Sequence, residues 1–149
     1  MSRVAVLREI PLWQRSTASF HADITVEPEH VGVLRERQSF DAAWQRGVLE
    51  LASPLRKDKS LTFTLVSRIR FSTDPPSLLS FVVARPIDAM ELRVVFRDEI
   101  PDRVRFRSWD VAEVIRDDTI LAIDPVNREA RSGTIPQPVR TLTYALLWE

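Results

Sequence analysis

Arginine is concentrated in one part of the chain, and its spacing there points to the binding of anions. The residues are Arg93, Arg97, Arg103, Arg105 and Arg107. A guanidinium group presents its N–H donors in a planar fork that matches a carboxylate or a phosphate. If these side chains share one face of a β-sheet, they predict a surface that binds phosphate, a small acidic ligand or an acidic partner protein.

The strands that would carry these arginines are predicted by a period of two in the sequence. From Leu61 to Trp109, apolar and polar residues alternate through four successive segments, as they do when side chains point to opposite faces of a strand. The alternation recurs at 20–26 and 141–148, and shorter candidate strands lie at 31–37, 48–51, 119–123 and 129–133. Turn signals separate the segments at roughly 8–12 residues, which leaves no room for the crossover helices that parallel strands need.

We therefore predict an all-β fold. It is expected to be one antiparallel β-sandwich domain over residues 1–149, immunoglobulin-like or related, with about 8–10 strands and at most one or two short helices. The segments 39–47 and 110–115 can each be interpreted as a short helix or as part of a hairpin. Whether residues 1–18 belong to the core stays open, as does the order in which the strands pair.

A turn at residues 98–102 predicts a hairpin between the third and fourth segments, with apolar side chains facing apolar side chains. Arg97 then lies opposite Arg103. By the same register, Arg93 lies opposite Arg107. Like charges directly opposite each other are unfavourable. Either solvent or the carboxylates of a neighbouring strand compensate these charges, or the arginines form an anion-binding face.

The composition excludes several classes of function. Lys+Arg and Asp+Glu both number 21, so no overall field attracts nucleic acid, and direct nucleic-acid binding is not expected. The chain has no cysteine, which excludes disulfides, thiol catalysis and thiolate metal sites. No apolar run is long enough to span a membrane, and the N-terminal apolar stretch is too short for a secretory signal. A cytoplasmic location without membrane association is expected.

Other residues that could do chemistry favour structural roles. His21 and Asp23 share a strand face near Glu29 and His30, but two histidines without a further strong ligand are a poor zinc or general-base signal. The acidic residues around 98–102 and 117–118 lack the ligand spacing of a calcium loop; they are Asp98, Glu99, Asp102, Asp117 and Asp118. No nucleophile-elbow motif is present. No metal and no cofactor are expected.

Aromatic residues suggest a core and an alternative binding site. Trp148 is expected in the core, whereas the roles of Trp13 and Trp44 stay open. A pocket between the sheets would make the chain a small-molecule sensor. Its lining would consist of Phe63, Phe81, Phe96, Phe106 and Tyr144.

The order of segments in the C-terminal part of the chain is similar to that of a known kind of domain. The run from Ser77 to Pro86 leads into 90–96 and 100–109, and the chain ends with 144–149. This order resembles an uncharacterised β-rich domain of actinobacterial proteins that often lies C-terminal to helix-turn-helix modules. The resemblance extends over roughly the last two thirds of the chain. It implies a bacterial, non-catalytic sensing or interaction module and supplies no functional residues. This chain has no DNA-binding helices of its own, which puts a role in transcription in doubt.

The function expected from the sequence is a non-catalytic protein-interaction or regulatory binding module, not an enzyme. Another protein would dock on an exposed sheet face or an edge strand, with the arginine-rich face as one way to bind an acidic partner. The alternatives are the small-molecule sensor and a hydrolase whose site the sequence does not show. The identity of the partner or ligand, the biological pathway and the association of identical chains stay open.

Overall fold

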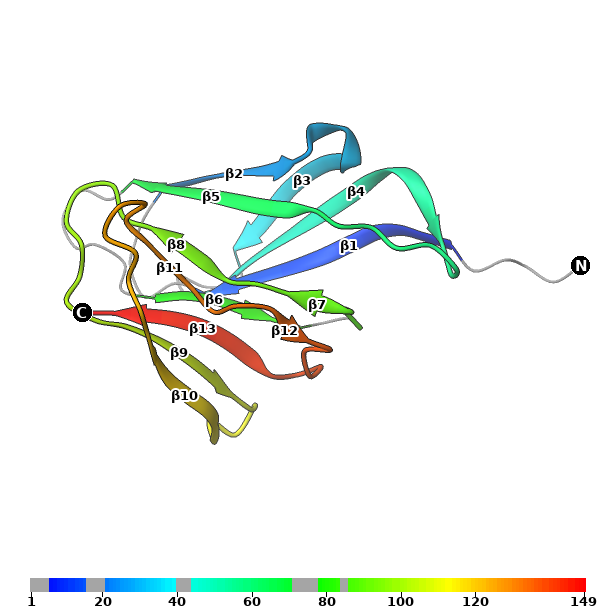
Figure 1. Cartoon of the computed structure of the whole chain (residues 1–149). Helices are drawn as coiled ribbons and strands as arrows, with labels where there is room; N and C mark the ends of the chain where they lie inside the picture. Colours follow the sequence, from blue (N-terminus) through cyan, green and yellow to red (C-terminus); the bar gives the residue numbers. More distant parts are fainter. Residues whose placement is uncertain (1–5, 16–20, 40–43, 71–77, 84–85) are drawn as a thin grey trace, which may run out of the picture. The chain divides into compact units, whose positions relative to one another are not determined.

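The computed structural model describes the backbone of residues 6–15, 21–39, 44–70, 78–83 and 86–149 (Figure 1). It describes the side chains of 25–35, 48–66, 78–83 and 86–149. Within these residues the regular structure consists of thirteen β-strands and one 3-10 helix, η1 (Glu29–Val31). The predicted all-β fold is confirmed, with more strands than expected because several are only two or three residues long.

The chain divides into two compact units. The first consists of Met1–Trp13 with Ala18–Pro75, and the second of Gln14–Thr17 with Pro76–Glu149. The single domain expected over residues 1–149 stays a prediction beside this division.

The first unit is built from two layers of antiparallel strands. Its strands are β1 (Val6–Arg15, up to Trp13), β2 (His21–Glu27), β3 (Gly32–Ser39), β4 (Trp44–Arg56) and β5 (Thr64–Arg70). One layer has β4 between β1 and β3, and the other pairs β2 with β5. Buried side chains from both layers meet in one core, which contains Val26, Val31, Leu49 and Leu51, with Leu34, Leu55, Phe63 and Leu65 packed against it.

The second unit has the same two-layer plan. Its strands are β6 (Leu78–Val82), β7 (Ala89–Met90), β8 (Arg93–Val95), β9 (Val104–Trp109), β10 (Ile115–Leu121), β11 (Glu129–Arg131), β12 (Ile135–Pro136) and β13 (Thr143–Trp148). The first layer runs in the order β10-β9-β13-β6, and the end of β1, at Gln14 and Arg15, pairs with β6. The second layer contains the pair β8–β11, and β7 pairs with β12.

The core of the second unit lies between these two layers. Val104 and Leu146 come from the first layer, and Ala130 comes from the second. Phe96, which follows β8, meets the ring of Trp148 edge-on, with 5.6 Å between ring centroids and 77° between ring planes. The predicted antiparallel all-β fold is therefore confirmed, and Trp148 packs against this core as a partly buried residue.

The predicted hairpin across residues 98–102 is wrong. β8 pairs with β11, with Val95 opposite Glu129, whereas β9 lies between β10 and β13. The turn therefore carries the chain from one layer to the other. The physical reason is that alternation reports which side of a strand is buried. Two strands satisfy the same pattern whether they lie side by side in one sheet or face each other across a core.

The segment 110–115 belongs to a hairpin, and the described ends of the segment 39–47 lie in two paired strands. Residues 110–114 form the turn between β9 and β10, so the helical interpretation of 110–115 is wrong. β3 and β4 pair from Gly32 opposite Leu51 to Ser39 opposite Gln45, and residues 40–43 between them lie outside the described residues. Residues 6–15, within the segment whose role was open, form the strand β1.

Candidate functional site

The five predicted arginines do not share one face of a sheet. Arg93 lies in β8, in the second layer, and Arg97 follows that strand as an exposed residue. Arg105 and Arg107 lie in β9, in the first layer, and Arg103 directly precedes β9. The apolar residues between these arginines point into the core from opposite layers. The outward-facing arginines of β8 and of β9 consequently lie on opposite sides of the unit.

A carboxylate of the neighbouring strand compensates the two arginines of β9. Arg105 Nη1 donates to Asp118 Oδ1 at 2.9 Å, and Arg107 Nη2 donates to Asp118 Oδ2 at 3.2 Å. Hydrogen bonds from Arg105 and then from Arg107 hold the pKa of Asp118 below its ordinary value. This is the arrangement in which carboxylates of a neighbouring strand neutralise the arginines. The Nε of Arg107 is buried without a hydrogen-bond partner in the described part of the chain.

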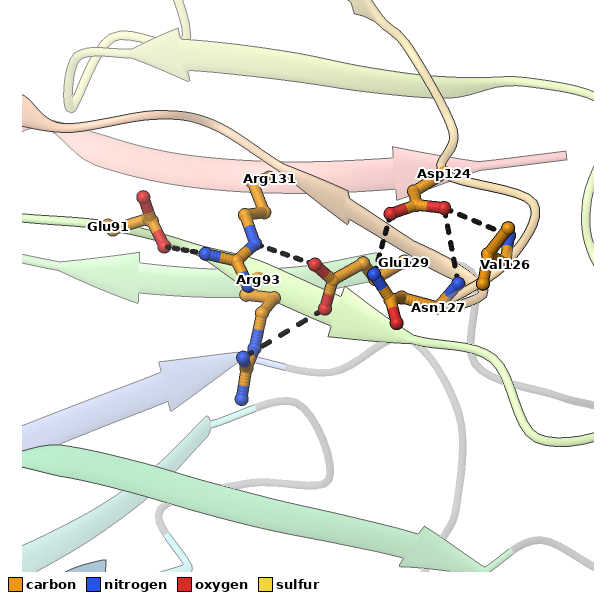
Figure 2. Close-up of polar contacts among 7 residues, drawn as sticks. All are labelled: Glu91, Arg93, Asp124, Val126, Asn127, Glu129 and Arg131. Atoms are coloured by element: carbon orange, nitrogen blue, oxygen red, sulfur yellow. Dashed lines mark hydrogen bonds and ion pairs between the residues drawn. The ribbon is translucent and has the colours of Figure 1, made fainter.

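The outer surface of the β8–β11 pair carries a ladder of alternating charges (Figure 2). Arg93 and Arg131 lie directly opposite each other on the two strands. Glu129 lies between them, with Oε1 2.8 Å from Arg131 Nε and Oε2 3.9 Å from Arg93 Nη1. Glu91 adds a second carboxylate, 3.6 Å from Arg131 Nη1. The hydrogen bond to Glu129 raises the pKa of Arg131 above its ordinary value, so the like-charged pair is compensated.

The loop between β10 and β11 positions Glu129, because the backbone groups of Asp124 and Glu129 exchange two hydrogen bonds, at 2.8 and 3.2 Å. Asp124 Oδ1 accepts hydrogen bonds from the backbone N–H groups of Val126 and Asn127, at 2.9 and 3.2 Å (Figure 2). Asn127 Nδ2 donates to the other carboxylate oxygen at 2.8 Å. These bonds hold the pKa of Asp124 below its ordinary value, the backbone N–H of Asn127 contributing most. Arg128 adds a link to the second layer by donating from Nε to the carbonyl oxygen of Phe96 at 2.9 Å.

A different surface stands out at the turn of the β9–β10 hairpin. The side chain of Asp110 organises this turn, because its Oδ1 accepts from the backbone N–H groups of Ala112 and Val114 at 2.9 and 3.0 Å. Arg116 Nη2 donates to its Oδ2 at 2.9 Å. Glu113 adopts a left-handed backbone conformation with φ 62°, and its N–H donates to the carbonyl oxygen of Asp110 at 3.0 Å. The turn is thus closed by its own hydrogen bonds.

This ordered turn presents apolar side chains to solvent. Val111 is 87% exposed, and Val114 and Ile115 are each about half exposed. We call these three residues the hairpin-tip patch. Ile115 lies opposite the half-buried Trp109 on β9, so the patch continues into a large aromatic side chain. Sequence reasoning missed the patch because it left 110–115 open between a short helix and part of a hairpin. The available signal in the sequence was Asp110, because an aspartate in a turn accepts hydrogen bonds from the N–H groups that follow it.

A second loop reaches the same end of the unit. Thr143 at the start of β13 pairs with Trp109, so the loop that precedes β13 lies near the hairpin turn (Figure 1). The hydroxyl oxygen of Tyr144 accepts a hydrogen bond from the backbone N–H of Val139 at 2.7 Å. Val139 is itself more than half exposed. This end of the second unit therefore carries exposed apolar side chains on two loops that are anchored by hydrogen bonds.

The other residues singled out in the sequence are placed as follows. Among the residues that the structure describes, no three histidine, aspartate or glutamate side chains are grouped so that they could hold a metal ion. Glu29 and His30 are exposed. The side chains of His21, Asp23, Trp13 and Trp44 lie outside those that the structure describes. Of the aromatic residues expected to line a pocket, Phe63 packs in the first unit and Phe96 and Phe106 in the second. Phe106 stacks against Tyr144 with 6.3 Å between centroids. Phe81 lies opposite Tyr144 on β6.

Comparison of the chain with protein-family models, with curated proteins and with solved structures found no match. The resemblance to the β-rich actinobacterial domain stays a prediction. In the described part of the chain, no helix has the length and apolar character needed to cross a membrane.

Proposed function

We propose that this chain is a non-catalytic protein-interaction module that contacts its partner through the hairpin-tip patch. The observation that carries the proposal is the exposure of Val111, Val114 and Ile115 on a turn that hydrogen bonds already hold in one shape. Contiguous exposed apolar side chains commonly mark protein–protein contact sites. An ordered loop loses little conformational entropy on binding, which favours affinity.

The chemistry around the patch supports a protein partner with an apolar cleft. Glu113 lies between the apolar side chains and brings a negative charge to the turn, where the charge of Asp110 is paired with Arg116. A negative charge at this position disfavours a phosphate-rich surface such as nucleic acid. A valine or isoleucine that enters an apolar cleft contributes about 1.5–3 kcal/mol when its side chain becomes fully buried. Three such side chains, buried together, form the apolar centre of a contact whose rim is polar.

The proposal can be tested with a photo-crosslinking amino acid introduced at position 111. Position 126 is the matched control, because Val126 is also a valine, is 85% exposed, and lies on the loop between β10 and β11, away from the hairpin turn. We expect a protein partner to be crosslinked in cells from position 111 and not from position 126.

The binding of the purified partner then gives a quantitative test. We expect the double variant Val111→Ser, Val114→Ser to bind about tenfold more weakly or worse, and Val126→Ser to bind like the unchanged protein. Equal binding by the two variants would refute the proposed surface. A crosslinked product that consists of two copies of this chain would mean that the patch mediates self-association and does not contact another protein. Turnover of generic esterase or phosphatase substrates by the purified protein would contradict the non-catalytic role.

A further inference from the structure

The first unit has a surface hollow that the proposed function does not use. The hollow has a volume of about 420 Å³ and lies between the connection that contains η1 and the end of β4 with the loop that follows it. Ligand sites commonly have volumes of about 300–1,000 Å³. Its lining consists of His30, Val31, Ser53, Pro54, Leu55, Arg56, Lys59 and Leu61.

The lining combines an apolar part with a polar rim. Val31 is buried in the core of the first unit, and Leu55 packs against that core. Leu61 is partly exposed and extends the apolar wall. The rim contains Arg56 and Lys59. A turn fixes the backbone of these two residues, because the N–H of Lys59 donates to the carbonyl oxygen of Arg56 at 3.0 Å. Both cationic side chains are therefore carried by a hydrogen-bonded turn.

Within the described part of the chain, the cations on this rim have no ion-pair partner, and Asp58, the carboxylate of the same turn, forms none of the ion pairs found there. None of the ion pairs found among the described residues involves His30, Arg56 or Lys59. In the second unit, by contrast, Arg105 and Arg107 each lie within 3.2 Å of a carboxylate oxygen. The lining of the hollow contains no carboxylate. Two unpaired cations, a histidine and a serine beside an apolar wall fit an anion that carries a hydrocarbon part.

We infer that this hollow binds a small amphipathic carboxylate. The carboxylate group pairs with Arg56 and Lys59, which present N–H donors suited to it. The Ser53 hydroxyl and the His30 ring lie on the same lining and supply further donors. The hydrocarbon part lies against Leu55 and Leu61, where removal of apolar surface from water stabilises the complex. This inference concerns the first unit and stands independently of the hairpin-tip patch in the second.

Octanoate is the probe that tests the inference, and octanamide is its uncharged counterpart. Titration of the full chain, followed by amide chemical shifts in nuclear magnetic resonance spectra, should move the signals of Ser53, Leu55 and Lys59 with octanoate. The double variant Arg56→Met, Lys59→Met should bind octanoate about tenfold more weakly, because both charge partners are lost. Lys57→Met is the matched control, because Lys57 lies in the same turn but does not line the hollow. It should bind as the unchanged chain does.

Each outcome decides the inference. Octanoate binding that depends on Arg56 and Lys59 but not on Lys57, together with weaker binding of octanamide, supports it. Equal binding of octanoate and octanamide would show that the charged rim is not used, and would overturn it. So would equal losses in the double variant and in the Lys57 control, or unmoved amide signals at millimolar octanoate. All substituted side chains are exposed, so the circular dichroism spectrum should be unchanged in every variant.

Discussion

The replacement of Leu146 by alanine tests the layered core of the second unit most directly. Leu146 lies in the middle of β13, is fully buried, and belongs to the core cluster with Phe96, Val104 and Ala130. Leucine-to-alanine changes in cores cost about 2–5 kcal/mol, and the cost is larger where the surroundings cannot collapse into the cavity. β13 is hydrogen-bonded on both sides, to β9 and β6, so the backbone has little freedom to move inwards. We expect a loss of about 3–5 kcal/mol in the free energy of unfolding.

Urea unfolding followed by circular dichroism and by tryptophan fluorescence measures this loss. Ile120→Ala is the control, because Ile120 is an aliphatic residue of the same layer whose side chain is mainly exposed. Its removal should change the free energy of unfolding by about 0.5 kcal/mol or less. A loss below about 1.5 kcal/mol for Leu146→Ala, or equal losses for both variants, would show that the two layers do not share the core described above.

Three further results are expected. Gly32→Ala should lower the free energy of unfolding by about 1–3 kcal/mol in urea titrations, because a Cβ there would overlap the backbone carbonyl of Glu50; an unchanged stability would contradict the close approach. Glu129→Gln should destabilise the chain more than Glu91→Gln in thermal unfolding, because the side chain of Glu129 is only 12% exposed and contacts two arginines. High salt should reduce the difference in stability between these two variants, because it screens the ion pairs. Hydrogen bonds hold the pKa of Asp110 below its ordinary value of 3.8, and the bond from the backbone N–H of Val114 contributes most. The ionised form of Asp110 therefore stabilises the turn at pH values above 3.8. This contribution should be lost as the pH falls through the lower pKa. Amide shifts of the hairpin turn, followed from pH about 5 to about 2, measure this loss, and shifts that ignore the titration of Asp110 would contradict it.

Inward and outward positions could be predicted from the sequence, but the neighbours of each strand could not. Val104 and Leu146 point into the core as the alternation predicts. The sequence pattern predicts Arg107 of β9 as the residue opposite Arg93, whereas the structure pairs Arg93 with Arg131 of β11. The period of two carries no information on which strand lies alongside. That choice depends on the connection at 98–102, whose residues are compatible with a tight hairpin and with a passage between layers.

The candidate sites show the same division. The sequence predicted that carboxylates of a neighbouring strand could neutralise the arginines of β9, and Asp118 does so. It could not show the hairpin-tip patch, because the exposure of Val111 depends on the closed turn made by Asp110. Nor could it show the hollow at Arg56 and Lys59, since the residues that complete the lining come from a connection more than twenty positions earlier in the chain.

The place of β13 within the first layer has a consequence for how the second unit is made. β13 follows every other strand of that layer in the sequence, yet it lies between β9 and β6. During synthesis, the β9–β10 pair and β6 cannot join into one layer until residues 143–148, which form β13, have left the ribosome. The layer is completed when β13 inserts between β9 and β6. A fragment that stops before Thr143 leaves unpaired one edge of β9 and one edge of β6, both of which β13 otherwise covers. Such edges promote association between unfinished chains.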